Sequence, residues 1–203
     1  MDINYLNLQK AMFEGSGKYN IPQLEPAVFD NCELIGFNQV KQCKNRHNKA
    51  VLFFLDDYQF ERVWNRPDTY ISMLKQFRCV FSPDFSIYCD YPKALQIYNH
   101  YRKHWIGAYM QYNGICVIPT IGWSDETSFE WCFDGEPKGS AVAVSSVGTQ
   151  KSKQAKELFM NGYNEMLKRL EPTQIVFYGK VPSEIKDDRI INIRAFQERF
   201  RKK

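Results

Sequence analysis

Residues 50–57 read AVLFFLDD, an unbroken apolar run that stops at two aspartates. A run without polar alternation is typical of a strand that is buried on both faces, as the strands of parallel sheets are. Parallel neighbours must be joined by crossover connections, which are usually helical. The next residues supply one, because apolar side chains between Phe60 and Phe77 recur at mostly three- and four-residue steps, with Pro67 dividing the stretch into two short helices.

The same order of strand and helix recurs about five times along the chain. Further strands are predicted at residues 79–81, 115–118, 141–144, 174–178 and 189–193. Further helices are predicted from Pro92 to Gly114, over residues 152–170, and as a basic helix after the last strand. The predicted fold class is therefore α/β with a mostly parallel sheet, either an incomplete (β/α) barrel or an open doubly wound sheet. Helical connections of roughly equal length favour the barrel-like form.

The chain has 203 residues, 44% of them hydrophobic, which suffices for one α/β core. We assign residues 31–203 to a single domain and residues 1–30 to an N-terminal arm, because residues 1–30 are polar, rich in Pro and Gly, and without periodicity. The chain lacks an apolar run of membrane-spanning length and a signal-peptide pattern, and its six cysteines are widely spread. The sequence therefore predicts a cytoplasmic protein without membrane contact or disulfides.

The net charge of +4 is a mild surplus, and much of it lies in the terminal residues Arg194, Arg199, Arg201, Lys202 and Lys203. A basic tail can follow a nucleic-acid backbone, and the same residues are found at solvated helix ends. Both interpretations stay open at this point.

Polar residues gather where the predicted parallel strands end. Ligands of parallel α/β folds bind at this edge, because loops converge there and helix N-termini present unpaired N–H groups. The catalytic candidates are the carboxylates Asp84, Asp56 and Asp125, which could act as bases or hold Mg²⁺ beside a phosphate-bearing substrate. The ligand-binding candidates are Ser82, Arg102, Thr120, Trp123, Ser145, Ser146, Gly148, Tyr178 and Lys180.

Several of the polar residues at the strand ends also have a structural interpretation. An acidic residue just before a helix, such as Asp57, is a preferred N-cap, and Ser82-Pro83-Asp84 fits a tight turn. Residues 145–148, SSVG, resemble a phosphate cradle but lack the lysine and the spacing of a P-loop, so the start of a helix explains them as well.

Residues 101–105, YRKHW, mix bases with aromatic side chains, as nucleic-acid-binding surfaces do. Helical spacing assigns Tyr101 and Trp105 to the core and leaves Arg102, Lys103 and His104 as surface charges, which is the interpretation we favour.

Metal ligands are not assigned from the sequence. Cys43 and His47, with Cys32 upstream, do not make the paired ligands of a structural zinc site. His100 and His104 are four residues apart, but they lack the glutamate of an H-E-x-x-H motif, and we take their spacing as incidental.

Several short motifs in fixed order resemble the DUF4417 family. They are SPDFSIY at 82–88, NHYR at 99–102, WIGAY at 105–109 with Gln111, VIPT at 117–120, Trp123, Ser128-Phe129, FDG at 133–135, Gly139-Ser140 and VSSVG at 144–148. The resemblance covers residues 30 to 182 and omits the arm and the basic tail. It implies a protein of phages, plasmids or conjugative elements, and it carries over no reaction.

Two functions are compatible with these observations. The first is a mobile-element accessory protein that binds, and in one version processes, a nucleotide or nucleic-acid strand at the carboxyl ends of the parallel strands. The second is a non-enzymatic protein that binds a host or phage protein, for example as an inhibitor, through exposed aromatic side chains. The sequence does not decide whether the protein is an enzyme, and among cofactors it suggests only Mg²⁺.

Overall fold

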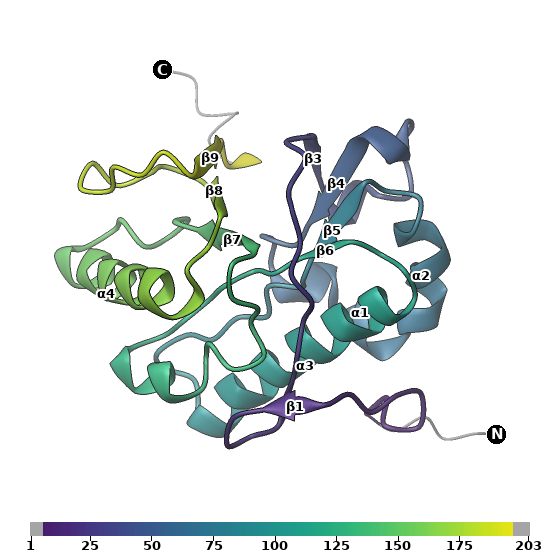
Figure 1. Cartoon of the computed structure of the whole chain (residues 1–203), viewed down its shortest axis with the longest axis horizontal. Helices are drawn as coiled ribbons and strands as arrows, with labels where there is room; N and C mark the ends of the chain where they lie inside the picture. The colour runs from purple at the N-terminus through teal and green to yellow at the C-terminus, as the bar shows by residue number, and fades with distance from the viewer. Residues whose placement is uncertain (1–5, 197–203) are drawn as a thin grey trace.

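The computed structural model describes residues 6–196 and confirms an α/β protein with parallel strands (Figure 1). One sheet has the order β3 (Glu33–Gly36), β4 (Lys49–Leu52), β5 (Cys79–Phe81) and β6 (Val117–Ile118). The other has the order β7 (Ala141–Ser145), β8 (Gln174–Tyr178) and β9 (Ile190–Ile193). A parallel bridge between Thr120 and Ala143 continues the pairing from β6 to β7. The strands within residues 6–196 do not close into a barrel.

The α-helices within residues 6–196 lie where the periodicity predicts them. They are α1 (Glu61–Asn65), α2 (Pro67–Leu74), α3 (Lys93–Tyr112) and α4 (Lys153–Leu170). Pro67 occupies the first turn of α2, where its missing N–H costs nothing. Gly114, with a φ of +78°, follows the end of α3 in a conformation that favours glycine. The Ser152 side chain caps α4 by accepting a hydrogen bond from the Ala155 N–H at 3.1 Å.

The expectation that every connection is helical and of similar length is wrong. Strand β3 was not predicted, because Glu33–Gly36 is too short to show an alternation. Short 3-10 turns, η1 (Phe37–Gln39) and η2 (Arg46–Asn48), join β3 to β4. The turn η3 (Asp57–Gln59) precedes α1, and η4 (Glu126–Glu130) lies between β6 and β7. Strands β8 and β9 are joined without a helix.

The two parallel sheets, joined by the bridge between Thr120 and Ala143, are buried on both faces. This explains the unbroken apolar runs in the sequence. Leu34, Ala50, Phe81, Ala143 and Tyr178 share one cluster with other residues of the same face, although they come from strands of both sheets. Because residues of β3 and of β8 contact the same cluster, the sheet curves around it like part of a barrel wall. The opposite face packs against α1, α2 and α3 in one cluster and against α4 in another.

Residues 6–30 of the N-terminal arm include side chains that pack into the core. The strands β1 (Gly15–Ser16) and β2 (Ile21–Pro22) form a small antiparallel pair, and the chain then runs past α3 toward β3 (Figure 1). Ile21, Leu24 and Phe29 are buried, so the arm supplies core side chains despite its polar composition. A Cβ on Gly107 of α3 would lie 2.8 Å from the Leu24 side chain, so the arm packs closely against the helix at this position.

None of the helices in the described part of the chain combines the length and apolar character of a membrane span. The predicted basic helix after β9 falls largely on residues 197–203, outside the described residues.

Candidate functional site

Helix α3 carries buried polar side chains along much of its length. They are Gln96, Asn99, His100, Arg102, Lys103 and His104. The expectation that the last three are surface charges is therefore wrong. A buried charge costs several kcal/mol unless it is paired and hydrogen-bonded, so the partners of these side chains determine what the helix can do.

A first network ties Arg102 to the ends of β4 and β5. Its guanidinium donates to Glu61 Oε1 at 2.6 Å and to Asn99 Oδ1 at 2.7 Å, and it lies 3.8 Å from the centre of the Phe85 ring. The Asn99 amide in turn donates to the Ser86 carbonyl at 2.6 Å. Arg102 was predicted as a ligand-binding residue, and the structure places it behind the loop that follows β5.

Asp57 belongs to the same network. Its carboxylate accepts hydrogen bonds from the Ser86 N–H at 3.1 Å and from the Ser86 hydroxyl at 2.9 Å. Asp57 therefore clamps the loop after β4 to the loop after β5, and it does not cap a helix as the sequence suggested. The N-cap residue of η3 is Asp56, which makes no side-chain capping bond.

A second network surrounds Glu136, whose carboxylate is fully buried. Lys103 Nζ lies 2.6 Å and His104 Nε2 2.9 Å from Glu136 Oε1, and Lys103 also donates to the Thr120 carbonyl at 2.8 Å. Burial opposes ionisation of Glu136, but the charges of Lys103 and His104 outweigh it and lower its pKa. Burial also lowers the pKa of His104 and, further, that of His100, and the Lys103 charge adds to both effects.

Asp84 lies at the carboxyl end of β5, as predicted, and it differs from every carboxylate above. It is partly buried, yet its carboxylate accepts no hydrogen bond from residues 6–196. Burial raises its pKa to about 7, against the opposing effect of Lys103 and with a further contribution from the Asp57 charge. Gly122, beyond β6, lies beside it, since an added Cβ there would be 3.8 Å from Asp84 Oδ1. The ends of β4, β5 and β6 therefore converge on Asp84.

A hydrogen bond between Ser82 and Thr120 joins two of these strand ends. Both are buried, and the Thr120 N–H donates to the Ser82 hydroxyl at 2.8 Å, which joins the ends of β5 and β6. Ser82 is thus engaged inside the protein, and Thr120 offers its carbonyl to Lys103.

The other two predicted catalytic carboxylates are placed less favourably. Asp125 caps η4 by accepting from the Thr127 N–H at 3.0 Å and the Thr127 hydroxyl at 2.6 Å, and these bonds lower its pKa. Asp56 is exposed and lies 3.4 Å from the Gln59 amide. Trp123 packs over Gly162 of α4 and donates from its indole N–H to the Leu158 carbonyl at 3.2 Å.

The remaining candidates lie at the ends of β7 and β8. The Ser146 hydroxyl donates to the Lys180 carbonyl at 2.8 Å, and Ser145 is paired in register with Tyr178. Tyr178 is buried and stacks on Phe54 with 5.0 Å between ring centres. Gly148 has a φ of +84°, and there is open space where a Cβ would lie. Lys180 is exposed. These residues share the carboxyl edge with Asp84, at strands farther along the sheet.

The sequence did not single out two exposed tyrosines at this edge. Tyr58 follows Asp57 and is 79% exposed, and Tyr88 follows Ser86 by two residues and is 59% exposed. The Asp57–Ser86 clamp holds their two loops together. The signal was available in the sequence, because each tyrosine lies within a few residues of a strand-end aspartate.

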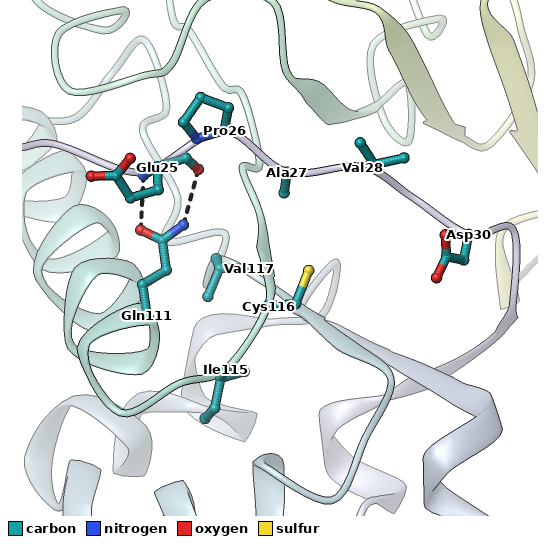
Figure 2. Close-up of a pocket in the computed structure, with 9 residues that line it drawn as sticks. All are labelled: Glu25, Pro26, Ala27, Val28, Asp30, Gln111, Ile115, Cys116 and Val117. Atoms are coloured by element: carbon teal, nitrogen blue, oxygen red, sulfur yellow. Dashed lines mark hydrogen bonds between the residues drawn. The ribbon is translucent and has the colours of Figure 1, made fainter.

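A separate pocket of about 530 Å³ opens at the opposite edge of the sheet (Figure 2). Residues 25–28 and Asp30 of the arm line one side, and residues 115–117 line the other. Gln111 closes one end by two hydrogen bonds to the Glu25 backbone, at 2.9 and 3.0 Å. The pocket faces the amino ends of the strands, whereas the polar residues that converge on Asp84 are at the carboxyl ends.

Comparison with known proteins agrees with the motifs. The DUF4417 model, described as a domain of unknown function, matches residues 13–197, so the match includes most of the arm that the motifs left out. Two "Gene 1 proteins" are similar over 178 residues, or 87% of this chain. The protein of Mycobacterium phage L5 is 42% identical with 77% of its length covered, and that of Mycobacterium phage D29 is 38% identical with 66% covered. No solved structure matches. The chain is therefore a member of the DUF4417 family, whose relatives here are phage proteins.

Proposed function

We propose that this protein is a phage or mobile-element accessory protein that binds a nucleotide or a single nucleic-acid strand at the Asp84 edge, with Mg²⁺ as the bridging ion. The Asp84 edge comprises Asp84, Asp57, Tyr58 and Tyr88. The observation that carries the proposal is that Asp84 is a partly buried carboxylate without a hydrogen-bond donor from residues 6–196. A partly buried carboxylate that no protein donor satisfies keeps its oxygens available to a cation bound from outside.

A divalent cation fits the charges at this edge better than a phosphate alone. Asp84 and Asp57 interact unfavourably with each other, and the nearby cations Lys103 and Arg102 are already paired with Glu136 and Glu61. Mg²⁺ prefers carboxylate and water oxygens and is commonly held by one or two carboxylates together with substrate phosphates. Asp84 would ligate the ion directly, whereas Asp57, which already accepts bonds from Ser86, would help hold the loop.

The two exposed tyrosines suggest what the rest of the ligand is. Tyrosine rings stack on nucleobases with little sequence preference, at about 1–3 kcal/mol per base. Tyr58 and Tyr88 lie on the two loops that the Asp57–Ser86 clamp joins, close in sequence to the carboxylates. A ligand with both a phosphate and a base would use both features.

Isothermal titration calorimetry tests the proposal directly. Ribonucleotides, deoxyribonucleotides and short single-stranded oligonucleotides are titrated into the protein with Mg²⁺ and with EDTA. We expect saturable binding that needs Mg²⁺ and that is weakened about tenfold or more by Tyr58→Ala or Tyr88→Ala. The matched control is Tyr112→Ala, another exposed tyrosine, at the C-terminal end of α3. No saturable binding to any of these ligands would overturn the proposal.

A second function rests on the same tyrosines, because exposed aromatic side chains are also typical of protein interface hot spots. In this case the wild-type protein would retain a host or phage protein in stoichiometric amount. Tyr58→Ala and Tyr88→Ala would release that partner, and nucleotides would neither bind nor compete.

A further inference from the structure

We propose that His100, His104 and Glu136 bind a divalent transition-metal ion inside the protein, behind the Asp84 edge. The proposal is independent of nucleotide binding, because none of the three residues belongs to that edge. The fold brings the two histidines together with a buried glutamate from another segment.

The three side chains supply ligand atoms in one small space. His100 and His104 are one helical turn apart on α3, with 4.4 Å between their ring centres. Glu136 lies between η4 and β7, and one atom from each side chain falls within 4.8 Å of the other two. All three residues are buried. Small side-chain movements would place each of these atoms at bonding distance from a shared ion. For zinc, the distance from the ion to an imidazole nitrogen or carboxylate oxygen is about 2.0–2.2 Å.

Backbone carbonyls orient both imidazoles. His104 Nδ1 lies 2.8 Å from the Pro22 carbonyl, and His100 Nε2 lies 3.1 Å from the Asp134 carbonyl. Because a carbonyl only accepts hydrogen bonds, each of these nitrogens carries a hydrogen, and the other nitrogen of each ring has a lone pair when the ring is neutral. Histidines that bind metals show this arrangement almost always, with the second ring N–H donated to a carbonyl or carboxylate.

Lys103 donates to Glu136 Oε1, but the contact between that oxygen and His104 Nε2 still needs a proton or a metal ion between the two atoms. The lone pair of neutral His104 Nε2 would face Glu136 Oε1 across 2.9 Å, and two acceptors at that distance repel each other. A proton or a metal ion between them removes the repulsion. Glu136 Oε2 is also buried and has no hydrogen-bond partner, so the carboxylate has an oxygen available for an ion.

The chain around the site is shaped to fit the rings. Gly135 has a φ of +77°, and an added Cβ would lie 2.5 Å from the Pro22 carbonyl oxygen and 2.7 Å from His104 Nδ1. Only glycine permits the loop to approach His104 this closely. The arm, α3 and the loop before β7 therefore meet at this point, and a bound ion would join all three.

The ligand set indicates the class of metal. Two imidazoles and one carboxylate occur in catalytic zinc sites and in non-haem Fe²⁺ sites, whereas Mg²⁺ and Ca²⁺ prefer oxygen ligands alone. The ion is therefore of a different kind from the Mg²⁺ proposed at Asp84.

Metal content and spectroscopy of the full chain test this inference. We measure bound metal by inductively coupled plasma mass spectrometry. One sample is purified without chelator, and another is stripped of metal and reloaded with Zn²⁺ or Fe²⁺. We expect about one equivalent of metal in the wild type. We expect the same amount in His47→Asn, which changes the exposed third histidine. His100→Asn, His104→Asn and Glu136→Gln should each lose most of it.

X-ray absorption of the zinc-loaded wild type keeps the test decisive if these variants fail to fold. We expect two imidazole ligands and at least one oxygen ligand. Wild-type protein that takes up no metal, a zinc site with sulfur ligands, or full metal content in a folded His100→Asn/His104→Asn double variant would each overturn the inference.

Discussion

Among single residues, Asp84 could be predicted from the sequence to lie at a strand end, but its burial could not. Ligands of parallel α/β folds bind at the carboxyl ends of the strands, and this rule selects Asp84 from the run Ser82-Pro83-Asp84. The structure places Asp84 at the carboxyl end of β5. The rule selects Asp56 and Asp125 equally, although Asp56 is exposed and Asp125 is a cap. The three carboxylates differ in how residues that are distant in the sequence, such as Gly122 and Lys103, pack around them. The local sequence around each aspartate does not predict this packing.

Replacing Asp84 with Asn should impair binding and not folding. The two side chains are nearly isosteric, but the amide cannot supply the negative charge that a cation needs. We expect Mg²⁺-dependent nucleotide affinity to fall at least about tenfold, measured by calorimetry. Asp125→Asn serves as the control and should leave affinity unchanged. Equal affinity in Asp84→Asn and the wild type would contradict this assignment.

The raised pKa of Asp84 also predicts how stability depends on pH. The folded protein holds the Asp84 proton more tightly than the unfolded chain does, so this stabilising contribution is complete below about pH 4 and is lost as pH rises to about 7. In Mg²⁺-free buffer, Asp84→Asn should match the wild-type melting temperature near pH 4 and exceed it by several degrees at pH 8. A difference between the two proteins that does not change with pH would contradict the raised pKa.

At the scale of elements, α3 was predicted as a helix but not with the correct exposure. Its bounds follow from Pro92, Gly114 and apolar spacing, which are local signals. Its burial depends on Glu61, Glu136 and Pro22, which are far away in the sequence and pair with its charged and imidazole groups. The expectation of a solvated charged face failed because helical periodicity does not show what covers the second face.

The Lys103–Glu136 pair permits a double-variant test of this buried network. Lys103→Met leaves the Glu136 carboxylate buried without its ammonium partner, and we expect a loss of about 3–5 kcal/mol in unfolding free energy. Lys103→Met combined with Glu136→Gln removes both charges and should recover part of that loss. Additive losses in denaturant titrations would show that the two groups are not coupled.

Helix α4 contains a glycine whose role can be tested in the same way. An added Cβ on Gly162 would lie 2.2 Å from the Trp123 indole, in a packed layer. Alanine gains about 1 kcal/mol in helix propensity. The overpacking costs about 1–3 kcal/mol and should outweigh this gain, lowering the melting temperature by a few degrees. Asn164→Ala on the exposed side of α4 should be neutral or stabilising, and a stabilising Gly162→Ala would contradict the packing.

At the scale of the whole molecule, the parallel α/β class could be predicted because apolar runs and helical periods repeat. The place of the arm could not, since its few core residues are separated by Pro, Gly and polar positions. Leu24 is 5% exposed and Val28 is 68% exposed, which gives a matched pair on one segment. Leu24→Ala should cost about 2–5 kcal/mol by denaturant titration, and Val28→Ala should cost almost nothing. Similar small effects at both positions would mean that the arm is not part of the core.

Asp84 is a partly buried carboxylate without a hydrogen-bond donor from residues 6–196, at the edge where three strands end. The most direct measurement is a carbon-detected NMR titration of the Asp84 carboxyl group, with Asp125 as the internal reference, in the absence and presence of Mg²⁺. We predict that the pKa of Asp84 is near 7 without the ion, and that Mg²⁺ lowers it while leaving Asp125 unchanged. An Asp84 pKa near 4 that does not respond to Mg²⁺ would contradict a cation-binding role for Asp84.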